Sequence, residues 1–196
     1  MRKDIDLGEL LAAPQEMCPA VYQYYKGLEN RRIILNDQFD SNIVETVALP
    51  LIDMDNDGTG KPIEIILSSP GGSVFDALFL ANIIDSVKTP VTIRVMGYAY
   101  SMGSLILMAG YSNPNVRKVC YGFSTGLIHG GSTYLEGTAS AVKDTFKFHE
   151  NMEEKIKQYV LTHSLLTEED YQKSERYELY LTAEDMLRLK IVDEIL

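Results

Sequence analysis

The stretch Ile63-Glu64-Ile65-Ile66-Leu67-Ser68-Ser69-Pro70-Gly71-Gly72-Ser73 decides the fold class, because it joins a predicted strand to a predicted helix. Residues 63–67 are apolar and rich in β-branched side chains, which predicts a strand. Apolar residues recur at helical spacing from 74 to 87, directly after the two glycines. A strand that leads through a short turn into a helix is the first half of a βαβ unit.

The same alternation continues on both sides of this stretch. Short apolar runs predict further strands at residues 32–35, 91–96, 116–121 and 126–128, and helical spacing predicts a helix at 42–51. Alternating strands and helices are typical of a mostly parallel sheet with helices packed on it. We therefore expect an α/β fold.

A long helix is predicted from 138 to 163, because no Gly or Pro intervenes and apolar residues recur on one face: Val142, Phe146, Ile156 and Val160. It would be about 40 Å long. A helix of this length is longer than is needed to cover a small sheet. We therefore expect part of it to project and pack against another subunit. A core helix with a solvated outer face is the alternative.

Two further helices are predicted to start near the C-terminus, at Thr167 with Asp170 and at Thr182 with Asp185. Each pair places a capping hydroxyl before free backbone N–H groups and an acid in the first turn. Residues 1–26, by contrast, show no clear period, and we interpret them as an extended or partly ordered N-terminal arm. We expect residues 27–196 to form one domain.

Composition limits the classes of function. The chain has 196 residues, 45% of them hydrophobic, which suits one globular domain. It carries 28 acidic against 18 basic residues, so no broad basic face is expected and nucleic acid is a poor partner. Cys18 and Cys120 lie far apart without metal-ligand spacing, and we interpret both as small buried apolar residues.

The sequence predicts a soluble, cytoplasmic protein. Residues 1–13 contain Asp4, Asp6 and Glu9, where a secretory signal needs an uninterrupted apolar stretch. The longest nearly apolar stretch, 105–109 with its flanks, is far shorter than the roughly 20 residues that cross a bilayer, so no membrane partner is expected.

Two glycine-rich turns are candidates for chemistry. Gly71 and Gly72 stand at a strand-to-helix turn, where free N–H groups could face a developing negative charge, as in an oxyanion hole. A tight turn with Ser73 as the helix cap is the alternative. Ser101 follows the strand at 91–96 and precedes an apolar helix, with glycines on either side. This pattern resembles the strained elbow that exposes a nucleophilic hydroxyl, although an ordinary N-cap has the same pattern.

A serine nucleophile needs a base, and the chain has three histidines. His149 and His163 fall within or at the end of the long predicted helix. His129 follows the predicted strand at 126–128 and precedes two glycines, so it lies at a strand end beside flexible backbone. His129 is therefore the best candidate base.

Taken together, these residues resemble the ClpP-type peptidases, the proteolytic subunits of ATP-dependent Clp proteases in the ClpP/crotonase superfamily. The resemblance runs over residues 31–196. It rests on five motifs in the family's order: Ser69-Pro70-Gly71-Gly72-Ser73-Val74, Ser101-Met102-Gly103 after Gly97, Leu127-Ile128-His129, Tyr180-Leu181-Thr182-Ala183-Glu184 and Ile191-Val192-Asp193. It implies repeated βαβ units with a projecting handle helix.

The resemblance also implies site residues. Ser101 would be the nucleophile and His129 the general base, with the amides of Gly71 and Met102 as the oxyanion hole. Glu178 stands where the family usually has the aspartate that orients the histidine. Glutamate is one methylene longer, so Glu175 and Asp170 stay open as alternatives.

The resemblance also implies that the protein assembles into a pair of stacked heptameric rings that enclose the active sites. Unfolded polypeptides or short peptides would be the substrates, and no cofactor is implied. The chain has no Walker loop, so a separate AAA+ Clp unfoldase would supply ATP-driven unfolding. Gly130-Gly131 replace the family's usual Gln-Pro, the turn at 111–115 is longer, and the N-terminal arm does not match. Such departures suit an atypical paralogue or a phage-type member.

One other motif is rejected. Residues 53–58 followed by Glu64 fit the written EF-hand pattern, but Pro62 and a predicted strand stand where the exiting helix should begin. We interpret this segment as an acidic surface turn.

Two alternative functions stay open beside the peptidase. Glu178 and the altered segment after His129 suit a catalytically idle structural subunit of a mixed ring. A crotonase-type acyl-CoA enzyme would share the fold and the oxyanion hole, but would leave the serine–histidine pair without a role.

Overall fold

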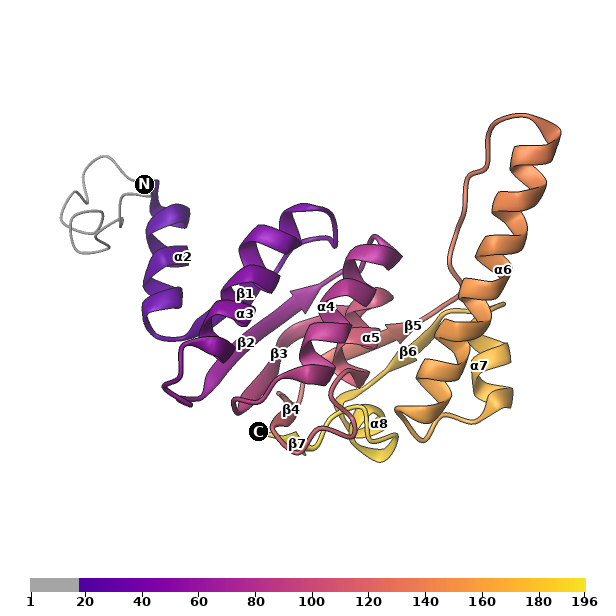
Figure 1. Cartoon of the computed structure of the whole chain (residues 1–196). Helices are drawn as coiled ribbons and strands as arrows, with labels where there is room; N and C mark the ends of the chain where they lie inside the picture. Colours follow the sequence, from indigo (N-terminus) through magenta and orange to yellow (C-terminus); the bar gives the residue numbers. More distant parts are fainter. Residues whose placement is uncertain (1–17) are drawn as a thin grey trace.

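A computed structural model describes residues 18–196 (Figure 1). Along the chain the elements are α2 (Pro19–Glu29), β1 (Arg32–Leu35), the π-helical turn η1 (Val44–Ala48), α3 (Leu49–Asn56), β2 (Ile63–Ser69), α4 (Val74–Ser86), β3 (Val91–Tyr100), α5 (Met102–Met108), β4 (Val116–Cys120), β5 (Thr125–Ile128), α6 (Ala139–Thr162), α7 (Glu168–Ser174), β6 (Leu179–Leu181), α8 (Ala183–Arg188) and β7 (Glu194–Ile195).

The strands form one mostly parallel sheet in the order β1-β2-β3-β4-β7. Strand β3 is long enough to change partners along its length. Its first half, from Val91 to Val95, pairs with β4, and its last residues, Tyr98 to Tyr100, pair with β5. Strand β6 then pairs antiparallel with β5. The predicted α/β class with a mostly parallel sheet is confirmed.

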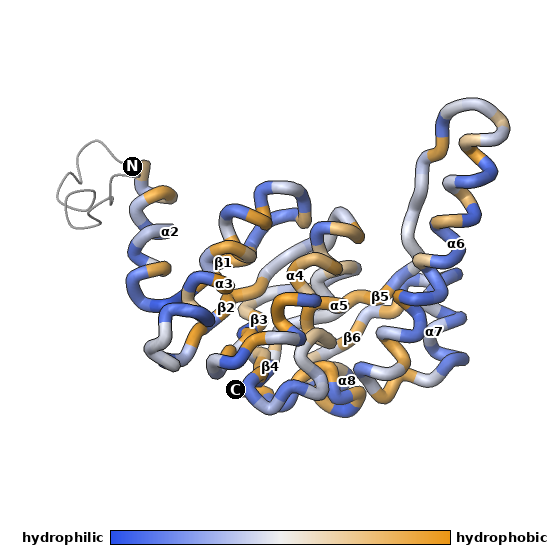
Figure 2. The backbone as a smooth tube through the Cα atoms, viewed as in Figure 1, coloured by the Kyte–Doolittle hydropathy of each residue, from blue (hydrophilic) through white to orange (hydrophobic). Residues whose placement is uncertain are grey.

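The sheet buries one face against helices and leaves charges on the other. Alternate residues of β2 are buried, beginning with Ile63 and Ile65, and α3, α4 and α5 lie together over the sheet in Figure 1. On the opposite face Glu64 forms ion pairs with Arg32 at 2.8 Å and with Arg94 at 2.7 Å. Orange segments concentrate in the strands and the adjacent helices in Figure 2, which is where the core lies.

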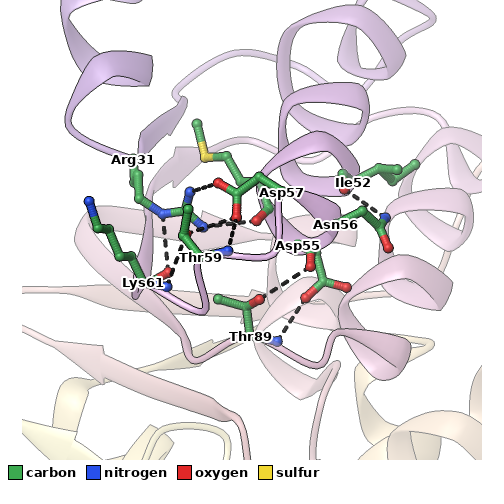
Figure 3. Close-up of polar contacts among 9 residues, drawn as sticks. Arg31, Ile52, Asp55, Asn56, Asp57, Thr59, Lys61 and Thr89 are labelled. Carbon is green, nitrogen blue, oxygen red and sulfur yellow. Dashed lines mark hydrogen bonds and ion pairs between the residues drawn. The ribbon is translucent and has the colours of Figure 1, made fainter.

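The acidic segment at 53–58 differs from the expected surface turn. Residues 53–56 form the end of α3, so the helix predicted at 42–51 ends later than expected. The carboxylates here bind other groups of the chain. Asp57 pairs with Arg31 and accepts from the Thr59 N–H, and Asp55 accepts from the Thr89 N–H (Figure 3). Asp55 also accepts from the Lys88 N–H. The sequence did not predict this end of the helix, because the acids at alternate positions show no helical spacing.

Asp55 ties α3 to the strand connection before β3, and its loss is expected to destabilise the fold. Its Oδ1 accepts from the N–H groups of Lys88 at 2.9 Å and Thr89 at 2.7 Å. Burial acts to raise the Asp55 pKa, but these hydrogen bonds outweigh it and hold the pKa below its ordinary value. We expect Asp55→Ala to lower the free energy of unfolding by about 1–3 kcal/mol at pH 7, because two N–H groups lose their acceptor.

The pH dependence of this loss follows from the depressed pKa. Stabilisation by the Asp55 carboxylate is present above the unfolded-state pKa of about 3.9 and is lost as pH falls through the folded-state pKa. Urea unfolding at pH 7 and at pH 3 should therefore show the difference between Asp55→Ala and wild type shrinking in acid. Asp53→Ala, an exposed acid of the same helix, is the control; an equal loss in both variants would contradict the prediction.

Helix α6 follows the predicted bounds closely and projects from the body of the molecule (Figure 1). Thr138 caps it by accepting from the Ala141 N–H at 3.3 Å. Val160 is its one buried residue, and Phe146 is 53% exposed, which rules out the alternative of a core helix. Stacking of Phe148 on Phe75 of α4, with ring centroids 6.2 Å apart, links the helix to the sheet layer. Packing against another subunit stays a prediction.

The two C-terminal helices begin as predicted. The Thr167 hydroxyl accepts from the Asp170 N–H, and Thr182 and Asp185 form a reciprocal capping box. Each cap joins two residues that are three positions apart. Four adjacent residues of sequence were therefore enough to predict where each helix begins.

Helix α2 was not predicted. We expected an extended or partly ordered arm over residues 1–26; residues 19–26 belong to helix α2, while residues 1–17 lie outside the part that the structure describes. Pro19 starts the helix, and Gly27 lets it approach β1 so closely that a Cβ there would lie 2.9 Å from the Arg32 carbonyl oxygen. Helix α2 runs across residues 26 and 27, where we expect the arm to end and the domain to begin. That division stays a prediction.

Two smaller expectations have different outcomes. Cys120 is buried as expected, and burial raises the pKa of its thiol, but Cys18 is exposed. Among residues 18–196, no helix combines the length and the apolar character that crossing a bilayer requires.

Candidate active site

Ser101 lies between the end of β3 and the start of α5 in a backbone conformation that side chains rarely adopt. Its φ is 55° and its ψ is −120°, and its hydroxyl makes no capping hydrogen bond. The alternative of an ordinary N-cap therefore fails, because a capping side chain would bond a backbone N–H of the first turn. Such a conformation costs on the order of 1–3 kcal/mol and persists only where its surroundings hold it.

The surroundings of Ser101 do hold it. The Ser101 N–H donates to the Leu127 carbonyl of β5 at 2.8 Å. Buried Ser104, one turn into α5, donates its hydroxyl to the Ala99 carbonyl at 2.7 Å and lies 2.9 Å from the Leu127 carbonyl. These contacts join β3, β5 and α5 at one point. The strained elbow is thus fixed by strands on both sides.

Gly71 lies directly against this elbow. A Cβ added to Gly71 would lie 2.6 Å from the Ser101 Cβ and 3.0 Å from the Met102 nitrogen, so any side chain would collide. Its φ of +94° also favours glycine. Met102 is the first residue of α5, and its N–H has no partner within the helix. The backbones of both predicted oxyanion-hole residues therefore meet at Ser101.

The glycine turn is anchored at its other side by Phe39. The Phe39 N–H donates to the Gly71 carbonyl at 2.8 Å, and the Ser73 N–H donates to the Phe39 carbonyl at 2.8 Å. The Gly71 N–H itself lies 3.2 Å from the Ser69 hydroxyl. Ser73 also caps α4, as the alternative interpretation expected. The segment is thus both a capped turn and a rigid backbone surface beside Ser101.

His129 and Glu178 adjoin the paired ends of two strands. In the antiparallel pair of β5 and β6, Leu127 faces Tyr180 and Ile128 faces Leu179. His129 directly follows β5 and Glu178 directly precedes β6, so both lie at the same end of this pair. Beyond it, the Gly130 N–H donates to the Ser174 carbonyl at 3.1 Å. The sequence could not locate this arrangement, because it depends on contact between distant segments.

The three side chains are not joined by hydrogen bonds in the part of the chain that the structure describes. His129 and Glu178 are both exposed. The Glu178 Oε2 accepts instead from the Tyr180 hydroxyl at 2.7 Å, and this carboxylate raises the Tyr180 pKa. Tyr180 is a contact that sequence reasoning missed, although its spacing of two residues along a strand gives both side chains the same face.

The two alternative acids have other positions. Asp170 accepts from the Thr167 hydroxyl at 2.7 Å at the start of α7. Glu175 contributes its backbone, with its carbonyl oxygen 3.1 Å from where a Cβ on Gly130 would be. Glu178 directly precedes β6, and the Glu175 backbone lies against Gly130, the residue after His129, so both acids belong to segments beside the end of β5.

The other histidines lie on α6 and at its end. His163 stacks on Tyr159 with ring centroids 3.9 Å apart, and its Nδ1 lies 2.8 Å from the Tyr159 carbonyl. His149 packs edge-on against Phe148. Neither residue lies at the carboxyl end of a strand.

Comparison with protein families decides the assignment. The family model described as Clp protease matches residues 15–196. The chain belongs to the Clp protease family. As a Clp protease family member it is a peptidase, and its family implies ring assembly and partnership with unfoldases in general. The match covers every element from α2 to β7, so the fold and the family agree over the whole described chain.

Proposed function

We propose that this Clp protease family member is a serine endopeptidase in which Ser101 is the nucleophile and His129 the general base. The observation that carries the proposal is the uncapped Ser101 hydroxyl at a positive φ, with the Gly71 backbone against it. A serine that caps a helix uses its hydroxyl oxygen to accept from a backbone N–H of the first turn. A serine at a fixed elbow whose hydroxyl caps nothing is free to attack a substrate.

The reaction is acyl transfer in two steps. The Ser101 oxygen attacks the carbonyl carbon of a peptide bond as His129 takes its proton, and the carbonyl oxygen becomes an oxyanion that the amides of Gly71 and Met102 stabilise. Collapse breaks the C–N bond, and His129 returns the proton to the leaving amine. Water, with its proton taken by His129, then attacks the acyl-enzyme and releases the second product and free Ser101.

Glu178 would complete the triad by accepting from the His129 Nδ1–H. Its position directly before β6, which pairs with the strand that ends one residue before His129, supports this role. Unrelated hydrolases use glutamate in the same role.

The substrates we propose are unfolded polypeptides and short peptides, cleaved inside a cytoplasmic chamber of stacked heptameric rings. The projecting α6, with Phe146 and Phe148 about half exposed, supports contact with further subunits through this helix. A separate AAA+ Clp unfoldase would deliver folded substrates.

Labelling with a fluorophosphonate probe tests the mechanism. We expect intact-mass analysis to show one adduct per chain on the native protein, and peptide mapping to locate it on Ser101. Heat-unfolded protein is the control, because activation of the hydroxyl needs the folded site. No adduct, or an adduct on another serine, would contradict the proposal.

A second candidate is an idle structural subunit in a mixed ring. It is favoured by one observation: no hydrogen bond connects Ser101, His129 and Glu178 within residues 18–196. This candidate predicts weak labelling of the isolated chain and a gain of peptidase activity only on addition of a paralogous Clp protease subunit. Native mass measured on the same samples reports the assembly in each case.

A further inference from the structure

Tyr180 belongs to a row of side chains that crosses three strands beside the proposed nucleophile. Tyr100 of β3 pairs with Leu127 of β5, and Leu127 pairs with Tyr180 of β6. The Tyr100 and Tyr180 rings meet edge to face, with centroids 6.1 Å apart. Since Tyr100 immediately precedes Ser101, this row connects the strand of the nucleophile with the strand of the proposed acid.

The row is itself held in place. Tyr100 contacts Tyr98 with centroids 4.8 Å apart, and its hydroxyl lies 3.0 Å from the Thr125 hydroxyl. Aromatic pairs of this kind restrict ring orientation. The direction of the Tyr180 hydroxyl is therefore set by packing on Tyr100, although Tyr180 is 58% exposed.

The Tyr180 hydroxyl binds the carboxylate that we propose orients His129. It donates to the Glu178 Oε2 at 2.7 Å, which is the length of a charge-assisted hydrogen bond. Glu178 is exposed, and within residues 18–196 this is the one hydrogen bond that its carboxylate makes. The phenol occupies one carboxylate oxygen and leaves Oε1 available on the same group.

We propose that Tyr180 is a positioning residue that pins Oε2 of Glu178 so that Oε1 is presented to His129. The inference rests on the proposed function, because it assigns Tyr180 a role only through Glu178 and His129. Its physical basis is the extra methylene of glutamate, which adds a rotatable bond to an exposed side chain. A fixed donor on one oxygen removes much of that freedom before His129 needs the carboxylate.

The Tyr180 hydroxyl keeps its proton over the working range of pH. The hydrogen bond to the Glu178 carboxylate raises the Tyr180 pKa above its ordinary value of 10.0. Donation to Glu178 therefore persists at neutral and mildly alkaline pH. Tyr100 of β3 contacts this pair from a neighbouring strand, and β5, which pairs with β6, ends one residue before His129.

Tyr180→Phe tests the proposal, because it keeps the ring contact with Tyr100 and removes only the hydroxyl. We expect the second-order rate of fluorophosphonate labelling at Ser101 to fall about tenfold. For a short peptide we expect kcat to fall and KM to stay unchanged. The acid limb of the labelling profile should move to lower pH, because Glu178, no longer fixed by the phenol, is held less closely toward His129 and stabilises its charged form less.

A double-mutant cycle with Glu178→Gln separates positioning from a merely structural role. If Tyr180 acts through Glu178, adding Tyr180→Phe to Glu178→Gln gives no further loss. Tyr134→Phe is the matched control, since it removes another tyrosine–glutamate bond of the same spacing, to Glu136 at 3.5 Å, and should leave the acid limb in place. Native mass verifies that all variants assemble alike.

The outcomes distinguish this inference from the proposed function. Additive losses in the cycle, or an acid limb that does not move in Tyr180→Phe while wild type is labelled at Ser101, would overturn the role of Tyr180 and leave the peptidase intact. Failure of wild type to be labelled at Ser101 would overturn the proposed function, and the role of Tyr180 with it.

Discussion

Ser101→Ala is expected to abolish labelling by a fluorophosphonate and to lower kcat for a short peptide by about 10⁴-fold or more. The loss follows because no other hydroxyl takes the place of Ser101 at the elbow. The hydroxyl of Ser104, in α5, is already hydrogen-bonded to the carbonyls of Ala99 and Leu127. Peptide hydrolysis measured by fluorescence and intact-mass labelling check the two parts of this prediction.

Ser86→Ala is the control for this variant, because Ser86 is an exposed serine that bonds only the carbonyl of its own helix. Its activity should equal that of wild type. Residual labelling of Ser101→Ala at the wild-type rate would show that another group is the nucleophile. Alanine at position 101 keeps the positive φ that any L residue finds costly, so its stability is expected to be close to that of wild type.

Gly71→Ala is expected to lower kcat by about 10²- to 10³-fold, the size of effect seen when an oxyanion-hole donor is lost. The new methyl group would lie 2.6 Å from the Ser101 Cβ and 2.7 Å from the Tyr100 carbonyl oxygen, which are backbone and stem atoms that cannot rotate away. Either the glycine turn or the elbow must therefore shift. Both shifts are expected to separate the Gly71 and Met102 amides, which we propose stabilise the oxyanion.

Gly122→Ala is the matched control for this substitution, because a Cβ at Gly122 meets nothing within 4 Å. Kinetics should be measured at a temperature where circular dichroism shows both variants folded, since the φ of +94° at Gly71 makes alanine costly there as well. A Gly71→Ala variant with kcat within about threefold of wild type would contradict the assignment of this amide.

Local signals explain most of what could be predicted from the sequence. Strand β1 and the caps at Thr138, Thr167 and Thr182 are encoded within a few adjacent residues, and the structure matches them. The glycine turn could be recognised as a close-approach site for the same reason. Ser101 could be singled out by its flanking glycines, while its uncapped hydroxyl needed the backbone geometry.

Contacts between distant segments account for the rest. Helix α2 depends on the close approach of Gly27 to β1, which no local period encodes. The extension of β3 to Tyr100 depends on its second partner, β5, because strand pairing rather than composition sets its end. Glu178 could be aligned from Thr182, but the approach of its segment to the end of β5 arises only when β5 and β6 pair.

The positive φ of Ser101 has a consequence for how such a chain could change over generations. Glycine reaches this conformation without steric cost, so a single Ser101→Gly replacement would relieve on the order of 1–3 kcal/mol of strain while deleting the nucleophile. At this position a substitution that removes the nucleophile would therefore increase the stability of the fold. This is an instance of the trade-off between stability and activity. A lineage that used this subunit only as scaffolding would gain stability by that one step, whereas this chain carries the costly serine.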